Sequence, residues 1–274
     1  MTHALQAAMF APEQGEHMTE PVIGKLAAAL KGDGVYSAWV GMNEPQVAEH
    51  LAREAFDTVV LDMQHGAVDT VGAARAILSV ALTGKPAVVR IPVGDFASAS
   101  RAADAGAAGV IAPMINSVAD AKAFADHVKF PPLGARSWGP RACAPLSGHV
   151  GPTYLHAANA ITLTIAMIET REALDAVDAI LAVEGIDGVF VGPADLSIAL
   201  SNGGMWDPRG ALVDKALDTV TSAARKAGKF AGLFCMDGAH AKASRARGFK
   251  FTSISSDIVL LRAAAKAELD KARG

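Results

Sequence analysis

The chain has 274 residues, of which 51% are hydrophobic, and its 25 basic and 28 acidic side chains leave a net charge of −3. This length suits one large domain, and the nearly balanced charge gives no reason to expect nucleic acid or an anionic membrane as a partner. No apolar run reaches the ~18 residues of a membrane span, and the first residues lack the features of a secretion signal, so we expect a cytoplasmic protein.

From Val35 onward, short apolar runs alternate with segments whose apolar residues recur at helical spacing. We expect residues 1–20 to form an N-terminal arm and residues 21–274 to form one domain. Strands are predicted over residues 35–40, 56–61, 87–91, 109–112, 161–168, 186–191, 229–234 and 249–254. Helices are predicted over residues 44–54, 70–82, 96–105, 118–128, 171–182, 208–227, 239–247 and 258–272.

Eight strands that alternate with helices predict a TIM (β/α)₈ barrel, for which a length of roughly 250 residues is typical. An open doubly wound sheet is the alternative, but no GxGxxG follows the first strand, which disfavours a dinucleotide-binding fold. Residues 130–158 interrupt the alternation because they are rich in proline and glycine. We expect an irregular segment there with a role such as covering a site.

Two carboxylates follow neighbouring predicted strands. Glu169 comes directly after the strand over residues 161–168, and Asp195 follows the strand over residues 186–191. A strand–helix–strand unit is parallel and right-handed, so both acids belong on the same rim, and adjacent strands lie about 4.8 Å apart. Hard oxygen ligands in this arrangement favour Mg²⁺ or Mn²⁺. Helix capping is the alternative explanation for an acid at such a junction.

Other polar residues also fall at predicted strand ends, namely Gln64, His65 and Arg90. A buried guanidinium costs several kcal/mol without a partner, so Arg90 requires either an internal carboxylate or an anionic substrate. A histidine such as His65, taken on its own, is more often a structural, hydrogen-bonded residue than a catalytic one. Asp104, in the helix after the third strand, could orient His65 by accepting a hydrogen bond from its ring.

The chain resembles the HpcH/HpaI aldolases from about Gly34 to Ala265. The resemblance is strongest in IETREAL (168–174) and VEGIDGVFVGPADLS (183–197), and FDTVVLDMQH (56–65), VVR (88–90), DAG (104–106) and FPPLGAR (130–136) support it. It implies a single-domain barrel, commonly hexameric, whose last helix is exchanged between subunits. It also implies a class II aldolase that makes or cleaves 4-hydroxy-2-keto acids from an aldehyde and a 2-keto acid, pyruvate or hydroxypyruvate.

The resemblance also suggests a role for individual residues. Glu169 and Asp195 match the ligands of a divalent metal, which would be Mg²⁺, Mn²⁺ or Co²⁺. Arg90 matches the residue that stabilises the enolate, and His65 and Asp104 match an acid/base and the group that raises its basicity. The substrate-binding positions are Trp39, Gln64, Met167 and the backbone of Ala194 and Asp195. Gln64 and Met167 stand where the family often has Glu and Gln, so substrate details are open at these two positions.

Three alternatives accompany this interpretation. A citramalyl- or malyl-CoA lyase uses a related barrel, but we see no cluster of basic residues for nucleotide phosphates. A non-catalytic barrel that binds keto acids is the second, and the four residues Glu169, Asp195, Arg90 and His65 argue against it. A Schiff-base lysine is the competing aldolase strategy. Lys229 and Lys250 begin the last two predicted strands at the wrong rim, which disfavours it.

Overall fold

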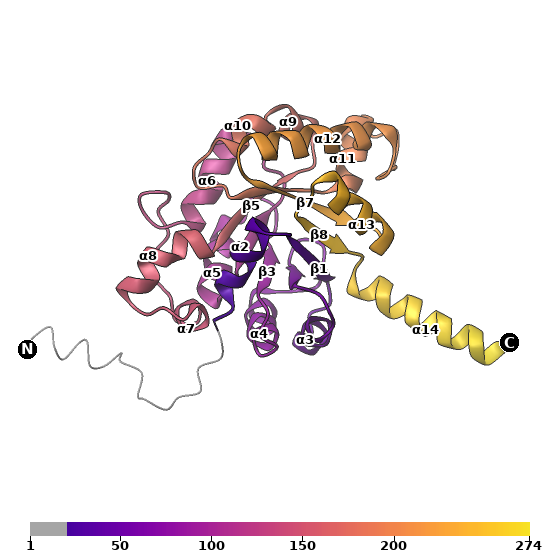
Figure 1. Ribbon diagram of the computed structural model, residues 1–274, viewed down its shortest axis with the longest axis horizontal. Helices are drawn as coiled ribbons and strands as arrows, with labels where there is room; N and C mark the ends of the chain where they lie inside the picture. Colours follow the sequence, from indigo (N-terminus) through magenta and orange to yellow (C-terminus); the bar gives the residue numbers. More distant parts are fainter. Residues whose placement is uncertain (1–20) are drawn as a thin grey trace, which may run out of the picture.

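A computed structural model describes residues 21–274, so the predicted arm over residues 1–20 lies outside the described part of the chain. Eight parallel strands close into one barrel in the order β1 to β8 (Figure 1). The strands are β1 (Val35–Val40), β2 (Thr58–Asp62), β3 (Ala87–Arg90), β4 (Gly109–Ala112), β5 (Leu163–Ile168), β6 (Gly188–Val191), β7 (Phe230–Cys235) and β8 (Phe251–Ile254). The predicted TIM barrel is confirmed.

Most of the helices cover the outside of the barrel. They are α2 (Ile23–Lys31), α3 (Pro45–Arg53), α4 (Thr70–Ala81), α5 (Phe96–Ala105), α6 (Val118–Val128), α7 (Cys143–Ser147), α8 (Pro152–Ile161), α9 (Arg171–Asp175), α10 (Val177–Leu181), α11 (Pro193–Leu200), α12 (Ala211–Lys226), α13 (Gly238–Arg247) and α14 (Asp257–Arg273). The helix predicted over residues 171–182 is two helices that meet at Ala176. The sequence prediction did not include α2, α7, α8 or α11.

Side chains alternate between the two faces of each strand, which separates the core into two layers. The inner layer fills the barrel with residues such as Val60, Val88, Ile165, Phe190 and Phe251, and α2 packs its apolar side against this layer. The outer layer joins the other face of the strands to the surrounding helices. Because α2 belongs to the inner layer, it closes the amino-terminal end of the barrel.

The segment over residues 130–158 is partly helical, since it contains α7 and the start of α8. Proline and glycine suggested an irregular segment, but Pro152 stands in the first turn of α8, where proline is tolerated. The segment lies at the amino-terminal end of the barrel, where the Leu146 carbonyl accepts a hydrogen bond from the Val22 N–H. It therefore does not cover a site at the carboxyl ends of the strands of the same chain.

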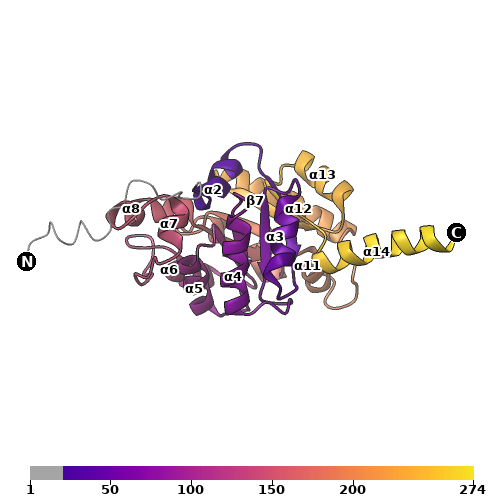
Figure 2. The same ribbon diagram turned by 90° about the horizontal axis from the view of Figure 1, so that it is seen from below.

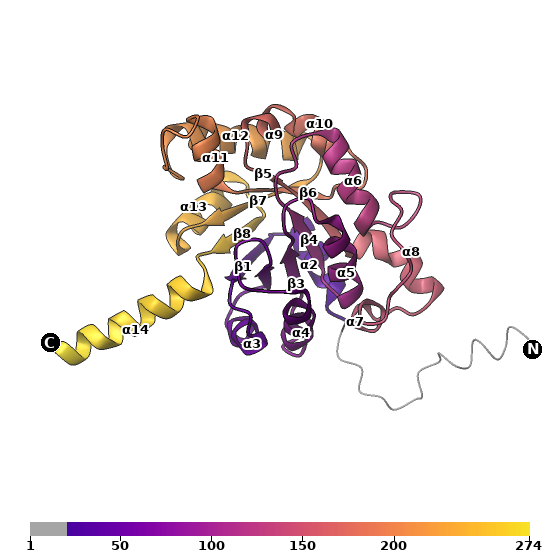
Figure 3. The same ribbon diagram turned by 180° about the vertical axis from the view of Figure 1, so that it is seen from behind.

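The last helix, α14, leaves the body of the molecule and projects outward in each view (Figures 1, 2 and 3). Asp257, its first residue, is the one buried residue among its seventeen. Ile258, Val259 and Leu261 are each more than half exposed. Among residues 21–274, none of the helices combines the length and apolarity that a membrane span requires.

Candidate active site

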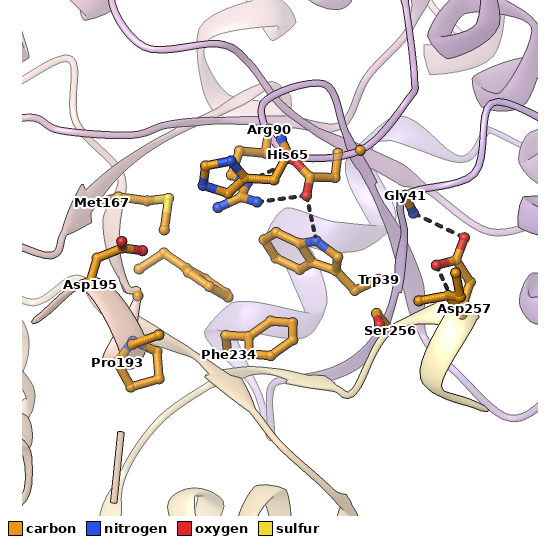
Figure 4. A pocket seen from close by; sticks show the side chains of 16 residues that line it. Trp39, Gly41, His65, Arg90, Met167, Pro193, Asp195, Phe234, Ser256 and Asp257 are labelled. Carbon is orange, nitrogen blue, oxygen red and sulfur yellow. Dashed lines mark hydrogen bonds and ion pairs between the residues drawn. The ribbon is translucent and has the colours of Figure 1, made fainter. Parts of the chain in front are cut away.

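A cavity of about 330 Å³ opens at the carboxyl ends of the strands (Figure 4). This is the end of a TIM barrel at which active sites lie. Residues from seven of the eight strands, or from the loops that follow them, contribute to it. The lining consists of Trp39, Gly41, Asp62, His65, Gly66, Arg90, Met167, Phe190, Gly192, Pro193, Ala194, Asp195, Phe234, Ser256, Asp257 and Ile258.

Arg90 is held by a carboxylate from the neighbouring strand. Asp62 and Arg90 are paired residues in the register of β2 and β3, and both side chains are buried. Arg90 Nε donates to Asp62 Oδ1 at 2.9 Å, and Arg90 Nη2 donates to Asp62 Oδ2 at 2.6 Å. The expectation that Arg90 needs an anion is confirmed. A two-point contact of this kind fixes the plane of the guanidinium as well as its position.

Asp62 also organises three other groups. Its carboxylate accepts hydrogen bonds from Trp39 Nε1 at 3.1 Å, from the Gln64 N–H at 3.0 Å and from the His65 N–H at 3.2 Å. Burial would raise the pKa of Asp62, but Arg90, Trp39 and the His65 N–H outweigh it, so the pKa lies below its ordinary value. Asp62 was not among the predicted site residues, although it lies three residues before His65 at the end of a strand.

Aromatic rings form the wall of the cavity below Arg90. The guanidinium lies 4.8 Å from the centre of the Trp39 ring, close enough for a cation–π contact. Trp39 in turn meets Phe190 at 5.7 Å and Phe234 at 5.3 Å between ring centres. Arg90 is therefore fixed by the Asp62 carboxylate and by contact with a rigid aromatic surface.

Glu169 is buried immediately after β5, beside the cavity. Its Oε1 accepts a hydrogen bond from the Met114 N–H at 2.8 Å, whereas Oε2 is buried with no partner among the described residues. Met114 adopts a φ of 56°, an uncommon backbone conformation for a residue with a side chain. Burial raises the pKa of Glu169 to about 7; the Met114 N–H opposes this, Asp195 adds to it, and Arg90 opposes it.

Asp195 lies in the first turn of α11, on the same rim as Glu169 and on the cavity wall. The N–H groups in the first turn of a helix have no partner within the helix and favour an anion. Ala194 and Asp195 place such groups beside the cavity. The negative charge of Asp195 adds to the rise that burial causes in the pKa of Glu169. Both acids therefore lie at the carboxyl-terminal rim of the barrel, Glu169 directly after β5 and Asp195 in the first turn of α11.

The remaining predicted site residues are only partly brought together. His65 and Met167 line the cavity with Arg90. Met167 is 1% exposed and packs in the inner core, so it both fills the barrel and borders the site. Gln64 is not part of the wall, and its side-chain Oε1 is buried without a partner among the described residues.

Asp104 lies far from His65 within the chain. It stands in the last turn of α5, which runs from the carboxyl end of β3 back to the amino end of β4. There it accepts a hydrogen bond from Arg136 Nη2 at 2.6 Å. His65 follows β2 at the opposite end of the barrel, so one chain does not form the predicted contact between them.

A closed parallel barrel with a cavity at the carboxyl ends of its strands is the arrangement found in TIM-barrel enzymes. The family model for HpcH/HpaI aldolase/citrate lyase matches residues 36–264. The chain belongs to this family, and it is an aldolase, a carbon–carbon lyase.

Individual relatives agree with this assignment. The chain is 40% identical to a hydroxypyruvate/pyruvate aldolase of Rhizorhabdus wittichii over 243 residues, which cover 89% of this chain and 96% of the relative. It is 31% identical to a 4-hydroxy-2-oxo-heptane-1,7-dioate aldolase of Klebsiella pneumoniae over 84% of this chain and 86% of the relative. The crystal structure of a family member from Burkholderia cenocepacia J2315 has a TM-score of 0.83 at 31% identity, covering 92% of this chain and all of that one.

Proposed function

We propose that this enzyme is a class II aldolase that joins or separates a pyruvate-type 2-keto acid, pyruvate or hydroxypyruvate, and an aldehyde with the help of a divalent metal. The observation that carries the proposal is the buried Oε2 of Glu169, which has no hydrogen-bond partner within residues 21–274 and lies near Asp195 at the rim of the cavity. The relative at 40% identity is named for hydroxypyruvate and pyruvate, which supports these compounds as the donor.

The residues present fit a hard divalent cation such as Mg²⁺, Mn²⁺ or Co²⁺. A buried carboxylate oxygen without a donor is costly unless a cation or a proton satisfies it. Glu169 and Asp195 would hold the metal. Within residues 21–274 no three His, Cys, Asp or Glu side chains are grouped as a metal site. In this proposal the protein therefore supplies two carboxylate ligands. Such sites commonly leave the other coordination positions to water and substrate oxygens.

When bound, the metal supplies Lewis-acid chemistry by drawing negative charge onto the keto oxygen of the donor. The N–H groups of Ala194 and Asp195 would bind the donor carboxylate. Arg90, held in place by Asp62, would direct fixed positive charge at the oxygen where negative charge develops, without any reorganisation during the reaction.

His65 would move the proton of the 4-hydroxyl group as the carbon–carbon bond forms or breaks. Trp39 and Met167 would pack against the donor, while the contribution of Gln64 would be indirect, through the strand end that it shares with His65.

A Schiff-base mechanism would require a lysine in the cavity, and none of the described residues that line it is a lysine. Lys229 Nζ donates to the Leu181 and Val183 carbonyls, and Lys250 Nζ donates to the Gly32 carbonyl. Lys129 is fully buried, but it pairs with Asp187 at the amino-terminal end of the barrel. These three lysines are held by contacts outside the cavity, which supports the metal-dependent mechanism over the Schiff-base mechanism.

We further propose that the enzyme is a homo-oligomer, a hexamer by family resemblance, in which α14 is exchanged between subunits. The apolar side chains that α14 exposes away from its own barrel support this arrangement. Any contact between Asp104 and His65 would then have to form between subunits, because one chain places them at opposite ends of the barrel.

Exchange of pyruvate methyl protons in D₂O tests the proposed function. We expect exchange in protein supplied with Mg²⁺ or Mn²⁺, its loss with EDTA, and its recovery when metal is added back. Glu169→Gln and Asp195→Asn should lose both metal binding and exchange, whereas Glu172→Gln, an exposed acid in α9, should behave as wild type. Full activity of either site variant in the presence of EDTA would contradict the metal assignment. A panel of aldehydes with pyruvate or hydroxypyruvate would then identify the acceptor.

A further inference from the structure

The first residue of α14 is bonded to the loop that follows β1. Asp257 is 4% exposed, and its Oδ2 accepts hydrogen bonds from the Gly41 N–H at 3.0 Å and the Met42 N–H at 2.9 Å. Its Oδ1 accepts a third bond from the Ile258 N–H at 2.8 Å. Hydrogen bonds to an ionised carboxylate are roughly twice as strong as neutral ones, so Asp257 fixes this loop firmly to the start of α14.

The same loop touches the segment that carries His65. The Gly41 carbonyl accepts a hydrogen bond from the Ala67 N–H at 2.7 Å. Gly66, directly after His65, lies so close to Gly41 that a Cβ atom at Gly66 would stand 2.7 Å from Gly41 Cα. Because the two backbones pack closely and the Ala67 N–H is bonded to the Gly41 carbonyl, we expect a displacement of Gly41 to reach Gly66 and the adjacent His65.

The junction between β8 and α14 is also conformationally constrained. Ser255 has a φ of 57°, a left-handed conformation that is uncommon for a residue with a side chain. Its N–H donates to the Cys235 carbonyl at 2.8 Å. Such residues persist only where their surroundings hold them, and they concentrate at functional sites. The chain therefore reaches Asp257 along a defined path, although α14 beyond it is almost wholly exposed.

We propose that Asp257 is a positioning residue for the active site and that it couples the placement of α14 to the geometry around His65. Asp257 lies across the cavity from Asp195, and its carboxylate is occupied by backbone N–H groups (Figure 4). It therefore acts through the Gly41 and Gly66 loops rather than on substrate. Whatever packs against α14 thereby influences catalysis. This inference rests on the proposed function for its kinetic readout.

Kinetics of the metal-supplied enzyme test the proposal. Asp257→Ala is expected to lower kcat for aldol addition by on the order of tenfold to a hundredfold, the range that a misplacement of about 1 Å can produce. The KM for pyruvate and the metal affinity should stay within about twofold of wild type. Asp257→Asn keeps one oxygen for the Gly41 and Met42 N–H groups, so it should recover most of the lost activity.

Asp270→Ala is the matched control, because Asp270 is an exposed acid of the same helix that pairs with Lys266. It should leave kcat unchanged. All variants are compared at equal oligomeric mass, determined by light scattering. An unchanged kcat in Asp257→Ala would overturn the proposal. The proposal would also fail if the loss of kcat in Asp257→Ala were not restored in Asp257→Asn and were fully explained by a smaller fraction of folded protein.

A spectroscopic readout separates this proposal from the proposed function. The His65 ring Cε1–H resonance is assigned by its absence in His65→Gln. We expect it to shift in Asp257→Ala, to return towards the wild-type position in Asp257→Asn, and to stay in place in Asp270→Ala. If the wild-type protein had no aldolase activity, the proposed function would fail, and the His65 resonance would still decide the coupling. A resonance that is identical in all three variants would refute it.

Discussion

Asp62 is the residue on which the rigid part of the site depends, because its carboxylate accepts hydrogen bonds from Arg90, Trp39 and the His65 N–H. Removing one partner of a buried ion pair leaves an uncompensated charge. We therefore expect Asp62→Ala to lower the free energy of unfolding by about 3 kcal/mol and to reduce kcat/KM for pyruvate. Denaturant unfolding and steady-state kinetics measure the two effects. Glu49→Gln is the control, since its ion pair with Arg53 lies at the surface and contributes little; a similar loss in both variants would contradict this role.

Glu169 should make metal binding depend on pH. In the metal-free protein its pKa of about 7 lies above the ordinary value of 4.5, so the folded chain retains a proton that the unfolded chain releases. This contribution to stability is present below pH 4.5 and is lost as the pH rises through 7. A metal must displace the same proton, so its affinity should rise about tenfold per pH unit below 7 and then level off.

Titration calorimetry with Mn²⁺ between about pH 5.5 and 8 measures this dependence. The Glu172→Gln protein should show the wild-type profile, because Glu172 is exposed and lies outside the site. Equal Mn²⁺ affinities at the two ends of this pH range would show either that Glu169 releases its proton at a pH outside the range or that it does not bind the metal.

At the scale of elements, the amino-terminal end of the barrel depends on Lys129. Its Nζ donates to the Asn159 carbonyl at 2.8 Å, the Thr162 carbonyl at 2.7 Å and Asp187 Oδ2 at 2.6 Å. Burial lowers the pKa of Lys129, and Asp187 opposes this effect. Lys129→Met should therefore lower the free energy of unfolding by about 3 kcal/mol, because the two carbonyls lose the lysine donor and Asp187, which keeps its bond from the Thr164 N–H, loses its ion-pair partner.

The same substitution should leave kcat unchanged wherever the protein is folded, since Lys129 lies at the end of the barrel opposite the cavity. Lys122→Met, an exposed lysine of α6, serves as the control and should change neither quantity. A loss of kcat in Lys129→Met at full folding would mean that the two ends of the barrel are coupled.

The strands were predictable because residues buried on both faces form continuous apolar runs, and all eight were predicted with ends within two residues of the observed ones. Short helices were harder to predict from the sequence. α7 has five residues, and proline at the start of α8 resembled a signal for irregular structure. α2 was missed although its apolar residues are helically spaced, because the alternation of strand and helix begins only after it.

The site residues that end strands could be predicted from the sequence. The contacts that depend on which strands pair, and in which register, could not. Arg90 required an anion, but only the register of β2 and β3 shows that Asp62 supplies it. Asp257 could not be inferred, because its bonds to Gly41 and Met42 form where β8 and β1 close the barrel. The position of Asp104 could have been foreseen, since a helix after a parallel strand runs back to the opposite end of the sheet.

At the scale of the whole molecule, α14 should make assembly depend on concentration. Its exposed apolar side chains, Ile258, Val259, Leu261 and Leu269, are more stable when covered, and burial is worth roughly 25 cal/mol per Å². We expect Leu261→Lys to lower the oligomeric mass in analytical ultracentrifugation. Lys271→Glu, an exposed change near the end of the same helix, should not do so. Identical sedimentation of the two variants would exclude α14 from the contact.

The outward direction of α14 also gives the molecule a natural place for a probe. A helix rises about 1.5 Å per residue, so its 17 residues carry the C-terminus about 25 Å from the point where α14 leaves the barrel. The two native thiols, Cys143 and Cys235, are buried, and burial raises both of their pKa values, which keeps them unreactive. A fluorophore on Ala272→Cys would therefore attach at one position and disturb no residue of the cavity. Energy transfer between differently labelled copies would then report how far apart neighbouring C-termini lie while the enzyme turns over.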